Sequence, residues 1–484
     1  MSLRHFLRPR PCGAELRAPR TRQCQQLRQR WHHGRGIDAQ LVRGCRDTVK
    51  RHRQCPRQIG ARPFELGARC GIADVIAFDM GGTTAKICVI DDGEPERSAG
   101  FEVARVHRFT KGSGLPLKVP VIEMIEIGAG GGSIATVNEL GLLQVGPESS
   151  SADPGPACYG RGGTQPTVTD ADLHLGYLDA GYFLGGRMRL DAGSAAAAIE
   201  AGIGKPLGVG LERAAWGIHA VVNDAMARAA KVHCLERGKD PRDYALVASG
   251  GAGPVHAYRV AEALGIRTVI YPLRAGVMSA LGFLVAAPAF EMLRAVVAPL
   301  AEVDAATLAA TLAEMEAEGR EQVASTGVRG ELRVERHLAM RFAGQSYALD
   351  VPLAAPADAA ALTAAAARFQ ALYRQRFHQL NPNVPVELVH LRVGVRAGPP
   401  RVELPAIGAG GRAESLKGIR RAYMPEAGGF IDCPVHDRYA LGAGDAVSGP
   451  AIIEEAESTV VIGAGSRGVV DAVGNLVVTL PRRD

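Results

Sequence analysis

The sequence predicts an α/β fold, followed by an α+β region and then by a small β-rich region. Two apolar runs flank a glycine bend at 75–90, and a third run, 244–248, enters a helical pattern through a second glycine bend. Beyond residue 300, alanine-rich helical patterns at 305–325 and 357–377 enclose alternating apolar residues at 332–342. Short apolar runs separated by glycines follow, at 451–453, 459–462 and 476–480. We therefore expect domains at 71–300, 301–400 and 401–484.

The first bend lies in the sequence A-F-D-M-G-G-T-T-A-K. The flanking apolar runs indicate a strand, a tight turn and a second strand. Gly81 and Gly82 carry no side chain, so backbone N–H groups there can approach a phosphate, and Thr83 and Thr84 add hydroxyls. Asp79 closes the first strand and could hold a magnesium ion or its bound water. An ordinary glycine hairpin with a capping threonine explains the same residues.

The second bend follows the short apolar run 244–248, which we interpret as a buried strand. Gly250, Gly251 and Gly253 come directly after this run and lead into a helical pattern. A strand that enters a helix through glycines presents free helix N–H groups to an anion.

Seven further motifs follow one another along the chain. They are G-A-G-G-G-S-I from Gly128, V-G-P-E-S-S-S-A-D-P-G-P-A-C-Y-G-R-G-G from Val145, P-T-V-T-D-A-D from Pro166, F-L-G-G-R-M-R-L-D from Phe183, A-G-V-M-S-A-L-G from Ala275, R-F-A-G-Q-S-Y from Arg341 and G-P-A-I-I-E from Gly449. Together with the two bends, this ordered series resembles the hydantoinase A / 5-oxoprolinase family, within the sugar-kinase/actin superfamily. The match extends over 71–480.

The resemblance implies an actin-like (ribonuclease-H-like) lobe at 71–300 that binds ATP and Mg²⁺. In such a lobe the two bends converge in space and form the floor of one pocket. Asp79 and Thr83 would be the catalytic residues, with Asp79 also orienting the magnesium ion. Residues 81–84 would hold the terminal phosphates, and the glycines of the second bend would pack against the adenosine.

The activity that the resemblance implies is ATP-dependent hydrolysis. The carbonyl oxygen of a cyclic amide or imide, such as 5-oxoproline or a hydantoin, is phosphorylated and water then opens the ring. Relatives that carboxylate ketones share these motifs, so an ATP-dependent ketone carboxylase subunit is an alternative. The resemblance also implies a small cyclic amide as substrate, a hydantoinase B-type subunit or domain as partner, and an oligomeric assembly.

One part of the family pattern does not occur in this sequence. Members of the family begin with another D-x-G-G-T-type lobe, whereas here the motif occurs once, at Asp79. The chain therefore looks like the second lobe and the carboxy-terminal region of a longer protein. A further alternative is a catalytically inactive fragment or a partner-binding subunit, because half of a clamp leaves the phosphates open to water.

Residues 1–70 differ in composition from the rest of the chain. They contain 16 arginines, one lysine and four acidic residues, a net charge of +13, whereas the other residues carry −7. High charge with few apolar residues predicts disorder. The segment shows only part of the sequence pattern expected for a nucleic-acid-binding arm, a transit peptide or a zinc module. We therefore favour an aberrant start, in which translated sequence unrelated to the rest of the protein joins the true reading frame near Gly71. The positive net charge of the whole chain therefore does not indicate nucleic-acid binding.

A long connection rich in glycine and proline, 111–167, precedes a group of candidate ligands. We expect no regular structure in it and a functional role for the loop. Asp170 and His174 lie four residues apart, as a metal-binding pair on one helical face would. The competing interpretation makes Asp170 a helix cap and His174 a surface residue. Cys158 could be a nucleophile only beside a base, and we favour a packed small residue.

Two other features leave alternatives open. The glycines at 128–132 could form a second anion-binding nest, or they could pack against the first hairpin. His233 and His256 lie within helical patterns, where core or surface positions are more common than catalytic ones.

The lengths of the apolar runs and the positions of the cysteines indicate the cellular compartment. No run approaches the roughly 20 residues that cross a bilayer, and no apolar secretory segment follows Met1. Cys88, Cys158, Cys234 and Cys433 are scattered, which indicates a reducing cytosol without a disulfide framework. We expect a cytoplasmic protein that does not contact a membrane.

Overall fold

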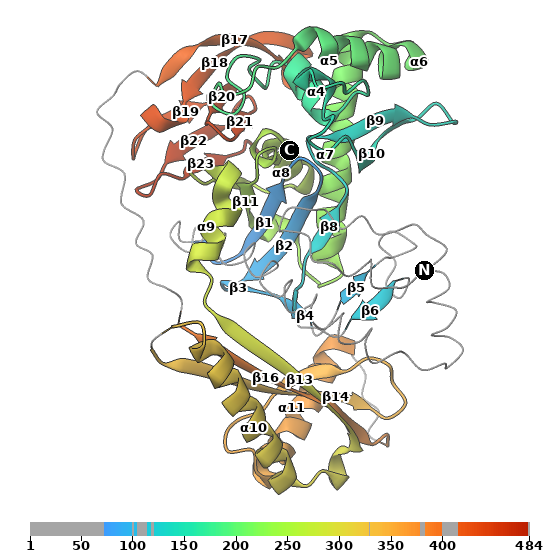
Figure 1. Cartoon of the computed structure of the whole chain (residues 1–484), viewed down its shortest axis with the longest axis vertical. Helices are drawn as coiled ribbons and strands as arrows, with labels where there is room; N and C mark the ends of the chain where they lie inside the picture. The colour runs from blue at the N-terminus through green and yellow to red at the C-terminus, as the bar shows by residue number, and fades with distance from the viewer. Residues whose placement is uncertain are drawn as a thin grey trace, which may run out of the picture. The chain divides into compact units, whose positions relative to one another are not determined.

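The computed structural model describes residues 72–98, 101–103, 114–117, 121–328, 330–377, 383–398 and 415–482. The Arg-rich segment 1–70 and its expected disorder lie outside these ranges. The described residues up to 283, together with those from 415 onward, form one compact unit, and the described residues between 284 and 398 form a second one. Figure 1 shows the elements of both units.

The first unit is built on a nine-stranded sheet in the order β19-β22-β23-β12-β11-β1-β2-β3, with β8 also paired to β2. Its strands are β1 (Val75–Met80), β2 (Ala85–Asp91), β3 (Glu94–Pro95), β8 (Ile125–Ile127), β11 (Ala245–Ser249), β12 (Thr268–Tyr271), β19 (Ala446–Ser448), β22 (Arg467–Val470) and β23 (Leu476–Thr479). The β1–β11 and β11–β12 pairs are parallel, and the remaining pairs of this sheet are antiparallel.

The helices of this unit cover both faces of the sheet. They are α4 (Val168–His174), α5 (Ala192–Ile199), α6 (Lys205–Leu207), α7 (Leu211–Leu235), α8 (Gly253–Leu264) and α9 (Met278–Val285). A π-helical turn, Glu200–Gly204, joins α5 to α6. No helix in the described ranges is long and apolar enough to cross a membrane.

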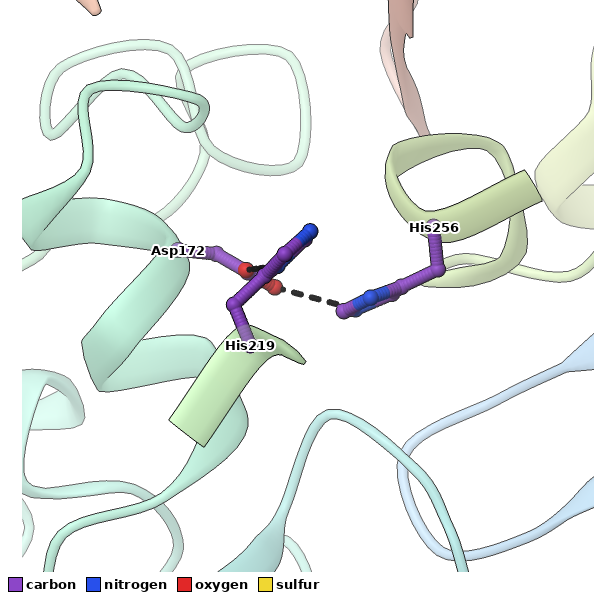
Figure 2. Close-up of side chains that lie close together, drawn as sticks. All are labelled: Asp172, His219 and His256. Carbon is purple, nitrogen blue, oxygen red and sulfur yellow. Dashed lines mark hydrogen bonds and ion pairs between the residues drawn. The ribbon is translucent and has the colours of Figure 1, made fainter. Parts of the chain in front are cut away.

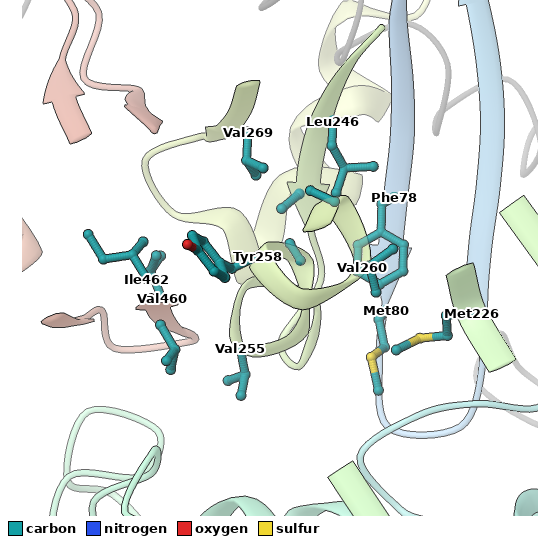
Figure 3. Packing of buried hydrophobic residues seen from close by; sticks show 14 of the residues in the cluster. Phe78, Met80, Met226, Leu246, Val255, Tyr258, Val260, Val269, Val460 and Ile462 are labelled. Atoms are coloured by element: carbon teal, nitrogen blue, oxygen red, sulfur yellow. The ribbon is translucent and has the colours of Figure 1, made fainter. Parts of the chain in front are cut away.

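Successive side chains of β1 point alternately into two hydrophobic cores, one on each face of the sheet. Phe78 and Met80 lie in the large core with residues of α7 and α8, as Figure 3 shows beside Met226 and Val260. Ala77 points to the opposite face and joins a smaller core with residues of α9. Successive side chains of a strand point to opposite sides, so an apolar strand with both faces covered positions its end rigidly.

Smaller sheets complete the first unit. They are β4 (Arg97–Ser98) with β7 (Val121–Ile122), β5 (Phe101–Val103) with β6 (Leu115–Leu117), β9 (Ser133–Val137) with β10 (Leu143–Ser149), and a four-stranded sheet of β17 (Leu416–Met424), β18 (Gly429–Asp437), β20 (Ala451–Glu454) and β21 (Thr459–Ile462). The expectation of no regular structure at 111–167 was therefore wrong. Alternation in this region is short and interrupted by glycines and prolines, so the strand pattern was hidden.

The carboxy-terminal strands differ from the expected separate module at 401–484. β23 pairs with β12 in antiparallel fashion, so residues from both ends of this unit share one sheet. Short apolar runs predicted β20, β21 and β23, but such runs carry no information about which distant strand each one joins.

The second unit has the α+β composition expected for 301–400. Its sheet has the order β13-β16-β14-β15. The elements are β13 (Ala289–Pro299), α10 (Ala305–Ala324), β14 (Leu332–Phe342), β15 (Leu349–Pro352), α11 (Ala359–Phe377) and β16 (Val386–Ala397). The unit begins earlier than expected because β13, which precedes residue 300, is one of its strands.

Candidate functional site

The two glycine bends lie against each other, as the family resemblance implies. Asp79 on β1 is opposite Ser249 on the parallel strand β11. The N–H of Ala252 donates to the carbonyl oxygen of Met80 at 3.0 Å. Gly250 has φ +88°, and a Cβ on it would lie 2.2 Å from the Met80 oxygen. Only glycine lets the two backbones approach this closely.

The first bend faces open space. A Cβ added to Gly81 or to Gly82 would meet no atom within 4 Å. Asp79 is half-buried beside this space, and its carboxylate accepts a hydrogen bond from Ser279 Oγ at 2.9 Å. The hairpin therefore combines an accessible backbone with a carboxylate held at its edge.

The glycines at 128–132 pack against the first hairpin, which was one of the two interpretations left open. The N–H groups of Gly131 and Gly132 donate to the carbonyl oxygens of Gly81 and Gly82 at 3.0 and 2.7 Å. A Cβ on Gly130 would lie 2.5 Å from the backbone nitrogen of Thr83. This segment thus fixes the conformation of the hairpin from one side.

The second bend offers fewer donors than expected. The N–H of Ala252 is bonded to Met80, and Pro254 has no N–H group. Gly250 donates to the carbonyl oxygen of Ala275 at 3.0 Å. With two N–H groups engaged and one position without an N–H group, the bend has fewer donors left for a phosphate, which favours a neutral part of a ligand there.

A buried carboxylate supports the turn that holds Gly250. Glu455 accepts hydrogen bonds from the backbone N–H groups of Arg274 and Ala275, both at 3.1 Å. Arg438 Nε lies 3.7 Å from the same carboxylate, and both side chains are 1% exposed. This buried pair ties the β20–β21 connection to the second bend.

The residues proposed from the sequence as a metal pair lie elsewhere. Asp170 forms the capping box of α4 with Thr167, and its carboxylate also accepts from the N–H groups of Ala157 and Cys158 at 3.2 and 2.7 Å. This is the competing cap interpretation. His174 packs edge-on against Phe430. Among the described residues, the group that could share a cation contains neither Asp170 nor His174.

The cysteine thiols are buried. Cys88, Cys158, Cys234 and Cys433 are free and buried. Burial, with the charge of Asp170 beside it, raises the pKa of the Cys158 thiol far above its usual range. A thiol that stays protonated is a poor nucleophile, which supports the packed-residue interpretation.

A second cluster lies behind the bends, and Figure 2 shows its three side chains pointing toward one another. Asp172 comes from α4, His219 from α7 and His256 from α8. His219 Nδ1 lies 2.7 Å from Asp172 Oδ1, and His256 Nε2 lies 3.2 Å from Asp172 Oδ2. All three residues are at most 2% exposed.

Burial and mutual contact set the charges of this cluster. Burial lowers the pKa of His219 to about 4, despite its hydrogen bond to Asp172. Burial also acts to raise the pKa of Asp172, but the charge of His256 and the hydrogen bond of His219 outweigh it and hold that pKa well below its usual range. Asp172 is therefore ionised at neutral pH, and His219 is neutral.

Sequence reasoning did not connect these three residues. Asp172 lies two residues beyond the helix-cap candidate Asp170, His256 fits an ordinary helical position, and His219 belongs to no motif. A signal existed in α7, where His219 and Asn223 interrupt the apolar stripe that contains Met226. Polar residues on the buried face of an amphipathic helix require buried partners.

The chain belongs to the hydantoinase/oxoprolinase family. The family model described as Hydantoinase/oxoprolinase matches residues 60–292, and the one described as Hydantoinase/oxoprolinase C-terminal domain matches residues 300–476. This confirms the resemblance that the ordered motifs indicate.

Two curated relatives illustrate the range of the family. Caprolactamase subunit alpha of Pseudomonas jessenii is 35% identical over 418 residues, which cover 85% of this chain and 58% of the relative. 5-Oxoprolinase 1 of Arabidopsis thaliana is 29% identical over 427 residues, which cover 84% of this chain and 32% of the relative. The chain thus spans less than two thirds of the length of either relative.

Two solved structures share this mixed α/β fold. The ATP-dependent caprolactamase from Pseudomonas jessenii is 32% identical with a TM-score of 0.72, covering 88% of this chain and 61% of that chain. Nucleotide-free acetone carboxylase is 25% identical with a TM-score of 0.70, covering 87% of this chain and 60% of that chain. Both solved proteins are described as ATP-dependent, one for lactam hydrolysis by its name and one for acetone carboxylation.

Proposed function

We propose that this chain is the nucleotide-binding part of an ATP-dependent enzyme that activates the carbonyl oxygen of a cyclic amide or imide for hydrolysis. The observation that carries the proposal is the contact between the two glycine bends, with Asp79 at the open edge of the first one. The relatives named caprolactamase and 5-oxoprolinase support a ring amide as substrate. We further propose that the lobe is actin-like, with this pair of bends as its nucleotide floor.

The residues present fit ATP and magnesium. The open space before Gly81 and Gly82 admits a phosphate against the backbone, and the Asp79 carboxylate offers the oxygen ligands that Mg²⁺ prefers. ATP supplies the phosphoryl group that converts the carbonyl oxygen into part of a leaving group.

Each residue of the bends then has a role. Residues 81–84 bind the terminal phosphates, with the hydroxyls of Thr83 and Thr84 as additional donors. Asp79 orients the magnesium ion or one of its waters. Gly250, Gly251 and Gly253 pack against the adenosine, in keeping with the engaged N–H group of Gly250. The chemistry is therefore positioning and charge neutralisation rather than covalent catalysis.

A second subunit is part of the proposal. Relatives of this chain include proteins named caprolactamase subunit alpha, acetophenone carboxylase gamma subunit and acetone carboxylase beta subunit. We propose a B-type subunit as the partner of this chain. The ring substrate would be bound and opened with that partner present.

Ketone carboxylation is the second candidate function. The structural similarity to acetone carboxylase, a TM-score of 0.70, is close to the 0.72 for caprolactamase. The ATP site proposed above serves both reactions, because each begins by making a carbonyl compound or its co-substrate more electrophilic. The substrate panel below distinguishes them.

The test compares two aspartates at opposite ends of the β1–β2 hairpin in the 484-residue chain. Asp79→Asn removes the carboxylate beside the open bend, and Asp92→Asn changes an exposed residue with φ 45° in the β2–β3 turn. Losing one charged contact is worth about 1.5–3 kcal/mol, so MgATP binding should weaken about 10-fold or more in the first variant only. Calorimetric titration measures this directly.

Substrate identity is tested with the B-type partner added. ADP release is measured with 5-oxoproline, hydantoin, caprolactam, and acetone with bicarbonate. We expect at least one ring amide to stimulate ADP release, and Asp79→Asn to abolish the stimulation. Equal MgATP binding by the wild type and Asp79→Asn would overturn the nucleotide site, whereas stimulation by acetone with bicarbonate alone would overturn only the hydrolase assignment.

A further inference from the structure

We propose that Asp172, His219 and His256 bind a divalent first-row transition-metal ion, with zinc as the probe. One ligand atom from each residue lies within 4.8 Å of the other two. The residues come from three different helices, so tertiary packing has brought together two imidazoles and a carboxylate in the interior. This site is separate from the magnesium proposed at Asp79 and does not depend on it.

The orientation of His256 supports a cation rather than a direct hydrogen bond. His256 Nε2 is buried and has no hydrogen-bond partner, although Asp172 Oδ2 lies 3.2 Å away. The lone pair or N–H bond of Nε2, which lies in the plane of the ring, is therefore directed beside this oxygen and not at it. Zinc bonds of about 2.0–2.1 Å place two tetrahedral ligands about 3.3 Å apart, which matches this separation.

The other nitrogen of His256 has the contact typical of a metal-binding histidine. Nδ1 lies 2.8 Å from Asn223 Oδ1, and the residue is 0% exposed. An Nδ1–H that donates to this amide oxygen leaves the Nε2 lone pair directed into the cluster. Outer-shell carbonyl groups commonly fix ligating histidines in this way.

His219 completes the set only if its ring turns, because it stacks on the ring of His256 with centroids 4.6 Å apart and a metal must lie in the plane of each ring. Its Nδ1 lies 2.7 Å from Asp172 Oδ1, so a metal that replaces the bridging proton must widen this contact by about 0.6 Å. The ring stacks on Trp216 and meets Tyr177 edge-on, which excludes bulk water from that side. A cation there would compensate a carboxylate that is otherwise buried at 2% exposure.

The ligand set indicates the class of metal. Two imidazoles and one carboxylate suit zinc, iron or cobalt, whereas magnesium and calcium prefer oxygen ligands alone. Three protein ligands leave a fourth position for water. The competing arrangement is a proton held between Asp172 and His256, with no metal.

Metal content of the full 484-residue chain decides between the two arrangements. Because the cluster is buried, zinc is supplied during expression, and loosely bound metal is removed by dialysis against a weak chelator. Elemental analysis should find about one zinc per chain in the wild type and at least a tenfold lower content in Asp172→Asn and His256→Gln. His174→Ala is the matched control, because this half-buried histidine of α4 lies outside the cluster, and it should retain full zinc content.

A spectroscopic measurement on the wild type tests the proposal even where a variant fails to fold. X-ray absorption at the zinc edge should show imidazole and oxygen neighbours, and cobalt substitution should give the visible bands of a four-coordinate site. Wild-type protein without bound zinc, or zinc content that is equal in the wild type and His256→Gln, would overturn the proposal in favour of the proton. Loss of zinc in His174→Ala alone would overturn it in favour of a different site.

Discussion

Replacing Gly82 by alanine should weaken MgATP binding while it leaves the stability of the folded chain nearly unchanged. Gly82 is exposed in the first bend, its φ lies outside the left-handed region, and a Cβ there would meet no atom within 4 Å. The folded chain can therefore accept the methyl group without a clash. If a phosphate occupies the open space, however, the methyl group takes the volume that the phosphate oxygen needs.

The expected change in unfolding free energy is smaller than the expected change in MgATP binding free energy. Stability should change by about 1 kcal/mol or less, and a small gain is possible because alanine restricts the unfolded chain. Binding should lose about 1.5–3 kcal/mol, the value of one hydrogen bond to a charged group, which corresponds to about 10- to 150-fold in dissociation constant. Gly210→Ala is the matched control, since this exposed residue with φ −66° also has no atom within 4 Å of its Cβ position.

Calorimetric titration with MgATP and chemical denaturation are the two assays. Gly210→Ala should match the wild type in MgATP affinity and lose at most about 1 kcal/mol of stability, because Gly210 is the N-cap of α7 and alanine is a poorer cap. Gly82→Ala should lose MgATP affinity and stay within about 1 kcal/mol of the wild type in denaturation. Unchanged MgATP affinity in Gly82→Ala would refute the assignment of the open space to a phosphate. Reduced affinity together with a large loss of stability would instead refute the claim that the bend tolerates a side chain.

Two further predictions concern the support of the second bend. Gly250→Ala should destabilise the first unit by about 2–5 kcal/mol, because alanine is strained at a left-handed φ and its methyl group overlaps the adjacent strand. The control Gly208→Ala, at φ +64° with open space around the Cβ position, should lose only the strain energy of about 1–2 kcal/mol. Equal losses of stability in urea denaturation would contradict the close approach at Gly250. Glu455→Ala leaves the Arg438 charge buried without its partner and should cost about 3–5 kcal/mol in the same assay, and a change below about 1 kcal/mol would contradict the pairing.

Local patterns predicted the elements well where they were long and regular. The apolar alternation of 332–342 and the alanine-rich pattern of 305–325 correspond closely to β14 and α10. β13 was not predicted, because the segment before residue 300 lacks a clear period of two. The joining of β23 to β12 was also missed, because pairing partners depend on the packing of the whole unit rather than on the strand itself.

The candidate sites show the same division. The glycine bends were predicted from sequence, because a glycine at a strand end reports a backbone requirement at that position. The cluster was not, since His219 and His256 are distant in sequence from Asp172 and each one resembles an ordinary helical residue. Only the packing of α7 and α8 against α4 brings the three side chains together.

The fold connects the buried cluster to the bends through two helices. On α4, Thr169 Oγ1 donates to the Gly131 carbonyl oxygen at 2.8 Å, and Asp172 follows three residues later. On α8, Gly253 packs against the first strand, and His256 likewise follows three residues later. Residues three apart share a helical face, so each helix contacts the bends with one turn and the cluster with the next. A cation that holds Asp172 to His256 would therefore fix the spacing between the segment supporting the first bend and the helix that continues the second.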